Sequence, residues 1–250
     1  YASMEHYGLA PADILLQADP EVLVSDLLDA LGSRLQGQQK WSAKTLQSES
    51  ALAEPSEIAV GPIRNADIGE ALNRLRDRFQ ITLARVPISW DGDLFPFREP
   101  LDFLGYDGGG GLSSGPGNTI GAALALRDTD RQVVGILGDG DFMQAASALW
   151  TAARYSIPAL FVIANNRSNL TDVAHQQTIA RQRGRAEENS GVGQHIDEPD
   201  IDLAALARAQ GVEARGPIRN HSELLRELEW GLSWISSGRP CLLDVQIARE

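Results

Sequence analysis

Cysteine is almost absent from this chain, and so are long apolar runs. Cys241 is the single cysteine among 250 residues, which excludes an internal disulfide and favours a cytoplasmic location. The apolar runs, such as 159–164, are about as long as a strand, whereas a membrane helix needs roughly 20 apolar residues. We therefore expect a cytoplasmic protein with no membrane partner.

Positive charge is also scarce. The chain has 22 Lys and Arg against 34 Asp and Glu, a formal net charge of −12. Such a surface repels phosphate backbones, so we expect no nucleic-acid partner. A signal peptide and a usual initiation site are both missing from the start, Tyr-Ala-Ser-Met-Glu, and we expect the chain to be a fragment of a longer protein.

The chain divides by pattern into three parts. Residues 1–35 contain a short apolar run and then a helix opened by Asp19-Pro20, and we interpret them as the tail of a middle domain. Residues 36–63 are polar, without a clear period, and are interpreted as a linker. Residues 64–250 alternate apolar runs with helical patterns, which predicts an α/β fold whose mostly parallel sheet has helices on both faces.

Within the third part, the patterns predict individual elements. Helices are expected over 64–80 and 142–155, with Trp150 in the core, and after caps at Asp202 and Ser222. The long segment 167–199 is polar and is expected to be irregular. Strands are expected at 81–88, 132–137, 159–164 and 241–247.

Two of these strands end in unusual residues. Gly138-Asp139-Gly140 follows one strand and opens a helix, and Asn165-Asn166 ends the next. The 24 residues between Gly140 and Asn165 are enough for one helix and one strand, so the two strands should be parallel neighbours. Asp139 and Asn166 would then converge at the carboxyl edge of the sheet, where ligands bind in such folds.

The chemistry of these residues is specific. A helix amino end offers free N–H groups and favours phosphate, and carboxylate and amide oxygens suit Mg²⁺ or Ca²⁺. The pattern therefore predicts a diphosphate and a divalent cation. Gly-Asp-Gly alone is also a common turn, and the glycine-dense segment 105–121 could be a surface loop.

Gly-Asp-Gly followed at this distance by Asn-Asn resembles the cofactor motif of thiamine diphosphate enzymes. Residues 147–166 resemble the same stretch in members similar to benzoylformate decarboxylase, and Gly110-Gly111-Leu112 resembles their glycine-rich segment. The resemblance covers most of 64–250. It implies thiamine diphosphate and Mg²⁺ as cofactors, a 2-oxo acid or aldehyde as substrate, and a homo-oligomer, either a dimer or a tetramer.

The resemblance also implies roles for single residues. Asp139, the side chain of Asn166 and the carbonyl of Ser168 would bind Mg²⁺, so Asn166 and Ser168 would also hold the cofactor. The Gly110 carbonyl would accept a hydrogen bond from the aminopyrimidine, and Leu112 would bend the cofactor from below. The diphosphate would be held by backbone N–H groups of three residues, Gly140, Asp141 and Phe142.

The same resemblance leaves gaps and alternatives. These enzymes activate the cofactor with a glutamate from a separate domain, which has no counterpart in residues 1–80, so we expect the chain alone to be inactive as a decarboxylase or carboligase. Asp141 stands where relatives often carry serine, and its carboxylate should point away from the diphosphate. A non-catalytic module of the same fold and a nucleotide-binding domain are the alternatives.

Overall fold

The computed structural model describes residues 16, 18–32, 61–88, 90, 92–105 and 111–249. The chain divides into two compact units, Tyr1–Ala53 and Glu54–Glu250. In the first, helix α1 spans Pro20–Gly32 and has no buried residue. Its start follows the prediction, since the Asp19 carboxylate accepts a hydrogen bond from the Glu21 N–H at 2.9 Å. Most of the short apolar run before it and most of the proposed linker lie outside the described residues.

The second unit is built on a five-stranded sheet whose order is β1-β2-β3-β5-β4. Every neighbouring pair is parallel, which confirms the α/β fold with a parallel sheet. The strands are β1 (Ile81–Arg85), β2 (Gln132–Gly138), β3 (Ala159–Asn165), β4 (Glu213–Ile218) and β5 (Cys241–Gln246). All of β3 is buried, as expected for a continuous apolar run in a sheet covered on both faces.

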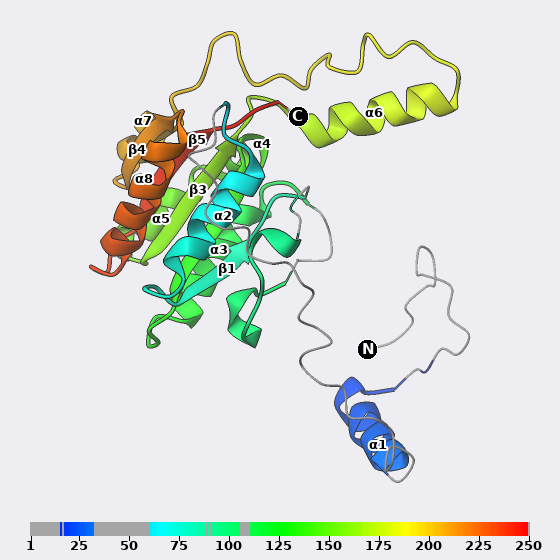
Figure 1. Ribbon diagram of the computed structural model, residues 1–250, viewed down its shortest axis with the longest axis vertical. Coiled ribbons are helices and arrows are strands. Elements are labelled where there is room, and N and C mark those ends of the chain that lie inside the picture. Colours follow the sequence, from blue (N-terminus) through cyan, green and yellow to red (C-terminus); the bar gives the residue numbers. More distant parts are fainter. Residues whose placement is uncertain are drawn as a thin grey trace. The chain divides into compact units, whose positions relative to one another are not determined.

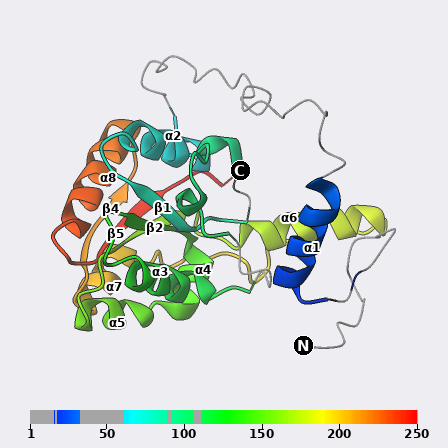
Figure 2. The same ribbon diagram turned by 90° about the horizontal axis from the view of Figure 1, so that it is seen from below.

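Helices cover both faces of this sheet, as Figure 2 shows. One face packs against α2 and α8, and the other against α3, α4, α5 and α7. The helices are α2 (Asn65–Leu75), α3 (Ser114–Ala125), α4 (Asp139–Ala145), α5 (Ala148–Arg154), α7 (Leu203–Ala209) and α8 (His221–Ile235). The hydrophobic contacts of the sheet therefore lie on its two faces, and a binding site can form at the ends of its strands.

Several element predictions were wrong in detail. The helix expected over 142–155 is broken into α4 and α5, and Trp150 is 57% exposed rather than in the core. Helix α8 is capped by Asn220, whose side chain accepts from the Glu223 N–H at 2.9 Å, and not by Ser222. Strand β4 was missed because its sequence, EARGPI, contains polar residues, glycine and proline instead of an apolar run.

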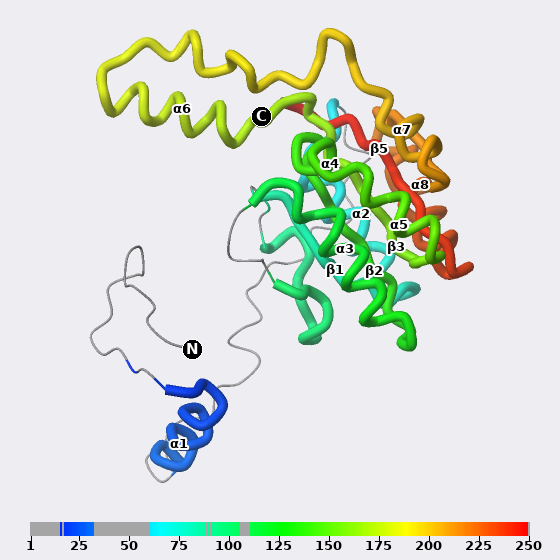
Figure 3. The backbone as a smooth tube through the Cα atoms, turned by 180° about the vertical axis from the view of Figure 1, so that it is seen from behind, coloured from blue at the N-terminus to red at the C-terminus, as the bar shows by residue number. Residues whose placement is uncertain are grey.

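The segment expected to be irregular contains another helix, α6 (Leu170–Gln182), which has no buried residue. It extends from the carboxyl end of β3 away from the sheet, and the chain then returns to α7 (Figures 1 and 3). Among the described ranges, no helix combines the length and apolar character needed to cross a membrane. The predicted cap of α7 is confirmed, since the Asp202 carboxylate accepts from the Ala205 N–H at 2.7 Å.

Candidate cofactor site

The site lies where strands β2 and β3 end. These strands are parallel neighbours in register up to Gly138 and Ala164. Asp139 follows directly as the first residue of α4, and Asn166 follows the last residue of β3. The prediction that the two strand tips lie side by side is therefore confirmed.

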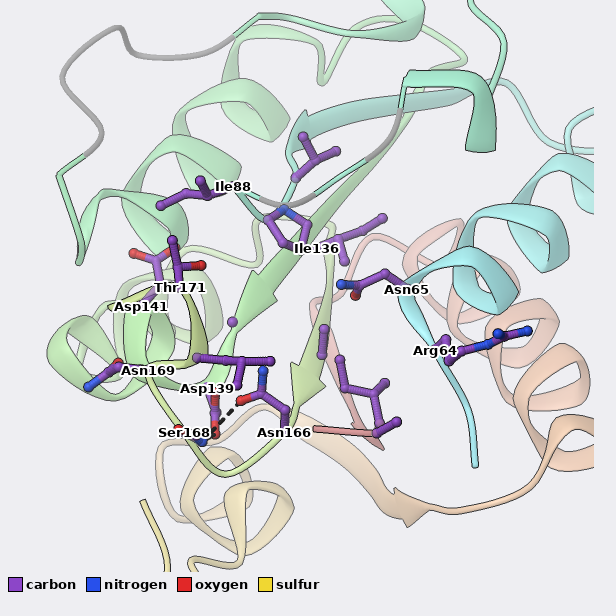
Figure 4. Close-up of a pocket in the computed structure, with 18 of the residues that line it drawn as sticks. Arg64, Asn65, Ile88, Ile136, Asp139, Asp141, Asn166, Ser168, Asn169 and Thr171 are labelled. Atoms are coloured by element: carbon purple, nitrogen blue, oxygen red, sulfur yellow. Dashed lines mark hydrogen bonds between the residues drawn. The ribbon is translucent and has the colours of Figure 1, made fainter. Parts of the chain in front are cut away.

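Both polar side chains converge on one backbone amide. The Ser168 N–H donates to Oδ2 of Asp139 at 3.1 Å and to Oδ1 of Asn166 at 3.0 Å, and Figure 4 shows the three residues together. Two oxygen atoms from residues that follow different strands thus lie within hydrogen-bonding distance of the same nitrogen. This arrangement fits a small cation bound by both side chains.

Burial of Asp139 disfavours the charged form of its carboxyl group. It is 2% exposed, and burial raises the pKa of its carboxyl group to about 6, although N–H groups of Gly140 and Ser168 partly oppose the shift. In the part of the chain that the structure describes, no charged side-chain nitrogen of Lys, Arg or His lies within 4.0 Å of its oxygens. A bound cation would supply the missing positive charge.

A cavity of about 740 Å³ opens beside these residues. Six of the predicted site residues line it: Leu112, Asp139, Gly140, Asp141, Asn166 and Ser168. Phe142 does not, because its side chain is fully buried in the core, and its expected role involves only the backbone N–H. Gly110 lies outside the described residues.

Leu112 is not a core leucine. Its exposed fraction is 38%, and it lies on the cavity wall just before α3. The next residue, Ser113, has a positive φ of 79°, an uncommon conformation for a residue other than glycine. The backbone of this short turn is therefore held by its surroundings, and Leu112 is presented to the cavity.

Gly140 is in tight contact with the loop after β3. A Cβ atom at this position would lie 2.1 Å from Oδ1 of Asn169, which no real side chain allows. Asn169 also lines the cavity. A larger residue at the start of α4 would therefore displace the Asn169 amide, which packs against the backbone there.

The loop that contains Asn166 is braced from the far end of the chain. Arg249 Nε donates to the Asn166 carbonyl at 2.8 Å, and its Nη2 donates to the Arg167 carbonyl at 3.1 Å. The same guanidinium forms an ion pair with Asp197. Arg167 itself has a positive φ of 57°, so Arg249 fixes a loop whose backbone is in an unusual conformation.

The ligand chemistry points to a hard cation. The described residues hold no group of three or more His, Cys, Asp and Glu side chains that could bind a metal. The candidate donors are instead one carboxylate and one amide oxygen, which suit Mg²⁺ or Ca²⁺ rather than Zn²⁺. Two protein oxygens leave several coordination positions for other ligands.

The sequence of residues 88–245 matches the family described as "Thiamine pyrophosphate enzyme, C-terminal TPP binding domain". This match covers more than half of the chain. The chain belongs to this thiamine pyrophosphate enzyme family. Its parallel sheet and the pairing of the Gly-Asp-Gly and Asn-Asn strand ends are therefore those of a thiamine diphosphate-binding domain.

Curated relatives agree with this assignment. Benzoylformate decarboxylase of Pseudomonas aeruginosa is 32% identical over 232 residues, which are 90% of this chain and 40% of the relative. A probable acetolactate synthase large subunit of Methanocaldococcus jannaschii is 26% identical over 245 residues, 94% of this chain and 39% of the relative. The chain thus spans about two fifths of the length of these relatives.

Solved structures share the fold. A thiamine diphosphate-dependent 4-hydroxybenzoylformate decarboxylase of Rhodococcus jostii matches with a TM-score of 0.62 and 24% identity, over 76% of this chain and 34% of that one. Benzoylformate decarboxylase of Polynucleobacter necessarius matches with a TM-score of 0.63 and 20% identity, over 79% and 35%. These matches show the fold of the thiamine pyrophosphate enzyme domain.

Three residues around the thiamine diphosphate domain's cavity were not predicted from the sequence. Arg85 and Asn169 line the cavity, and Arg249 braces the loop beside it. Their local sequence gives no sign of a role at the site, because each contacts a residue that is distant in the chain. Asn169, three residues after Asn166, is the one that the motif's position could have indicated.

Proposed function

We propose that this chain is the C-terminal cofactor-binding part of a thiamine diphosphate-dependent 2-oxo acid decarboxylase or carboligase, and that it binds the cofactor together with Mg²⁺. The observation that carries the proposal is the convergence of Asp139 and Asn166 on the Ser168 amide in the lining of the cavity. Membership of the thiamine pyrophosphate enzyme family supports the identity of the cofactor.

The proposed Mg²⁺ ligands are the Asp139 carboxylate, the Asn166 side-chain oxygen and the Ser168 carbonyl. The residues fit the ion, because Asp139 is a buried carboxylate with a raised pKa and without a basic partner among the described residues. Mg²⁺ prefers six oxygen ligands, so the remaining positions would be taken by diphosphate oxygens and water. Charge neutralisation would then offset the cost of burying Asp139.

The cofactor itself would be held by the start of α4 and by the turn before α3. Backbone N–H groups of Gly140, Asp141 and Phe142 would bind the diphosphate. Leu112, exposed on the cavity wall, would support the bent form of the cofactor, and the Gly110 carbonyl would accept a hydrogen bond from its aminopyrimidine. The cavity of about 740 Å³ is of the size used for cofactors and small ligands.

When bound here, thiamine diphosphate would supply a carbon nucleophile for carbonyl groups and an electron sink for the charge left by decarboxylation. The contribution of this chain is to orient the cofactor and to provide the apolar wall formed by Ile88, Leu94 and Ile136. The names of the relatives, benzoylformate decarboxylase and acetolactate synthase, support a 2-oxo acid substrate.

The chain alone is proposed to be inactive. The activating glutamate is expected from a separate domain, and this chain spans 40% of its decarboxylase relative. We propose that the working enzyme is a cytoplasmic homo-oligomer in which that glutamate comes from a partner subunit. Release of CO₂ from a 2-oxo acid at a normal enzymatic rate by the 250-residue chain would contradict this.

Titration calorimetry tests the binding proposal. Thiamine diphosphate should bind in the presence of Mg²⁺ and not after chelation with EDTA, and Asp139→Ala should abolish binding. The matched control is Asp130→Ala, which removes a carboxylate at an exposed position outside the cavity and should leave the Kd unchanged. Preference for a nucleotide over thiamine diphosphate in the same cavity would refute the proposal.

A further inference from the structure

A buried ion pair lies in the wall of the cavity. Arg85 is the last residue of β1, and Asp141 is the third residue of α4. The Arg85 Nε lies 3.9 Å from Oδ2 of Asp141, and the two side chains are only 4% and 8% exposed. Both residues line the same cavity as the proposed Mg²⁺ ligands. Charged groups are rarely buried to this extent unless they are paired.

The Asp141 carboxylate is fixed against the start of α3. Its Oδ1 accepts a hydrogen bond from the Ser113 N–H at 2.6 Å. Its Oδ2 lies so close to Gly115 that a Cβ there would be 2.2 Å away. The carboxylate therefore joins α4 to the first turn of α3, and a Cβ at position 115 would displace this carboxylate and the Leu137 side chain.

This contact determines where Leu112 lies. Leu112 directly precedes Ser113, whose backbone has a positive φ of 79° and whose N–H is held by Asp141. The hydrogen bond thus holds the turn that presents Leu112 to the cavity. A neutral serine at position 141 would have a shorter side chain and no charge for Arg85 to neutralise.

The arrangement carries an electrostatic cost near a diphosphate. The proposed function places phosphate oxygens at the N–H groups of residues 140–142, which include the backbone of Asp141 itself. A second negative charge within a few ångströms, in a buried site, weakens anion binding unless a cation compensates it. Arg85 is the guanidinium that faces the carboxylate from β1.

We propose that Arg85 is a positioning residue that neutralises Asp141, so that the carboxylate can hold the Leu112 turn without repelling the cofactor diphosphate. The inference rests on the proposed function and deepens it. It assigns to Arg85 a role in anion binding that acts through Asp141. Arg85 and Asp141 should therefore behave as one unit, in which loss of the cation alone is more harmful than loss of both charges.

A double-mutant cycle tests this, with titration calorimetry of Mg²⁺-thiamine diphosphate and of Mg²⁺-pyrophosphate on the full chain. Arg85→Met should raise both Kd values about ten- to a hundred-fold, since a nearby like charge shifts such equilibria by one to two decades. Asp141→Asn, which keeps an oxygen for the Ser113 N–H, should change them less than about threefold. The double variant should return to within about threefold of the wild type.

Controls separate this role from a structural one. Arg85→Lys keeps the charge and should bind both probes nearly as the wild type does. A merely structural pair predicts instead that the double variant binds as poorly as Arg85→Met, or worse, and that result would overturn the inference. If Arg85→Met does not fold, a more than tenfold loss of affinity in Asp141→Asn would overturn it, and retained affinity would support it. A wild-type chain that binds neither probe would overturn the proposed function, and this inference with it.

Discussion

Replacement of Asp139 by asparagine should stabilise the cofactor-free protein while destroying its metal site. The folded-state pKa of about 6 lies above the ordinary value of 3.8, because burial penalises the charged form. A group with a raised folded pKa stabilises the protein below its unfolded pKa. That contribution is lost as the pH rises through the folded pKa. When no cation is bound, the Asp139 carboxyl group therefore lowers the stability progressively between about pH 4 and pH 6, and by its full amount above that range.

The size of the effect follows from the two pKa values. The difference between 3.8 and about 6 is roughly two pKa units, and each unit corresponds to about 1.4 kcal/mol. Asp139→Asn should thus raise the free energy of unfolding by about 3 kcal/mol at pH 8, and by only about 1.5 kcal/mol at pH 5. The neutral amide keeps an oxygen for the Ser168 N–H, so that hydrogen bond is not lost.

Urea unfolding at pH 5 and pH 8, in EDTA and without cofactor, measures this difference. Asp130→Asn, at an exposed position, is the control and should match the wild type at both pH values. An Asp139→Asn variant that is no more stable than the wild type at pH 8 would refute the reasoning. So would a gain that is the same at both pH values, because it would not arise from titration.

Two further substitutions test how the loop after β3 supports the site. Gly140→Ala places a Cβ 2.1 Å from Oδ1 of Asn169, so the affinity for Mg²⁺-thiamine diphosphate in calorimetry should fall at least about tenfold. Adding Asn169→Ala to the same chain should recover part of the lost affinity. If it recovers none, the packing argument is contradicted. Arg249→Gln removes the guanidinium that donates to the Asn166 carbonyl and pairs with Asp197. Mg²⁺ binding should weaken about tenfold, as loss of an outer-shell partner typically causes, with little change in thermal unfolding of the metal-free protein. An unchanged Kd would show that Arg249 has no influence on the metal ligands.

Much of the architecture could be read from residue order because parallel strands and their helices leave strong local patterns. The run 159–164 is apolar on both faces, as a central strand must be, and it forms β3. Asp202 and Gly211 mark the two ends of α7, the glycine with a φ of 85°. Where the local signal is weak, at the edge strand β4 and at the break between α4 and α5, prediction failed.

The chemistry at the strand ends could be predicted from residue order. Gly-Asp-Gly and Asn-Asn end two successive strands with a helical connection between them, and in a parallel sheet this places a carboxylate and an amide at neighbouring strand ends. The residues that surround these strand ends depend on how the elements pack. Arg85 meets Asp141 across 3.9 Å, and Arg249 reaches the Asn166 carbonyl. The first contact joins residues 56 positions apart and the second joins residues 83 positions apart. Such contacts produce no local sequence pattern, because they depend on how whole elements pack rather than on the order of neighbouring residues.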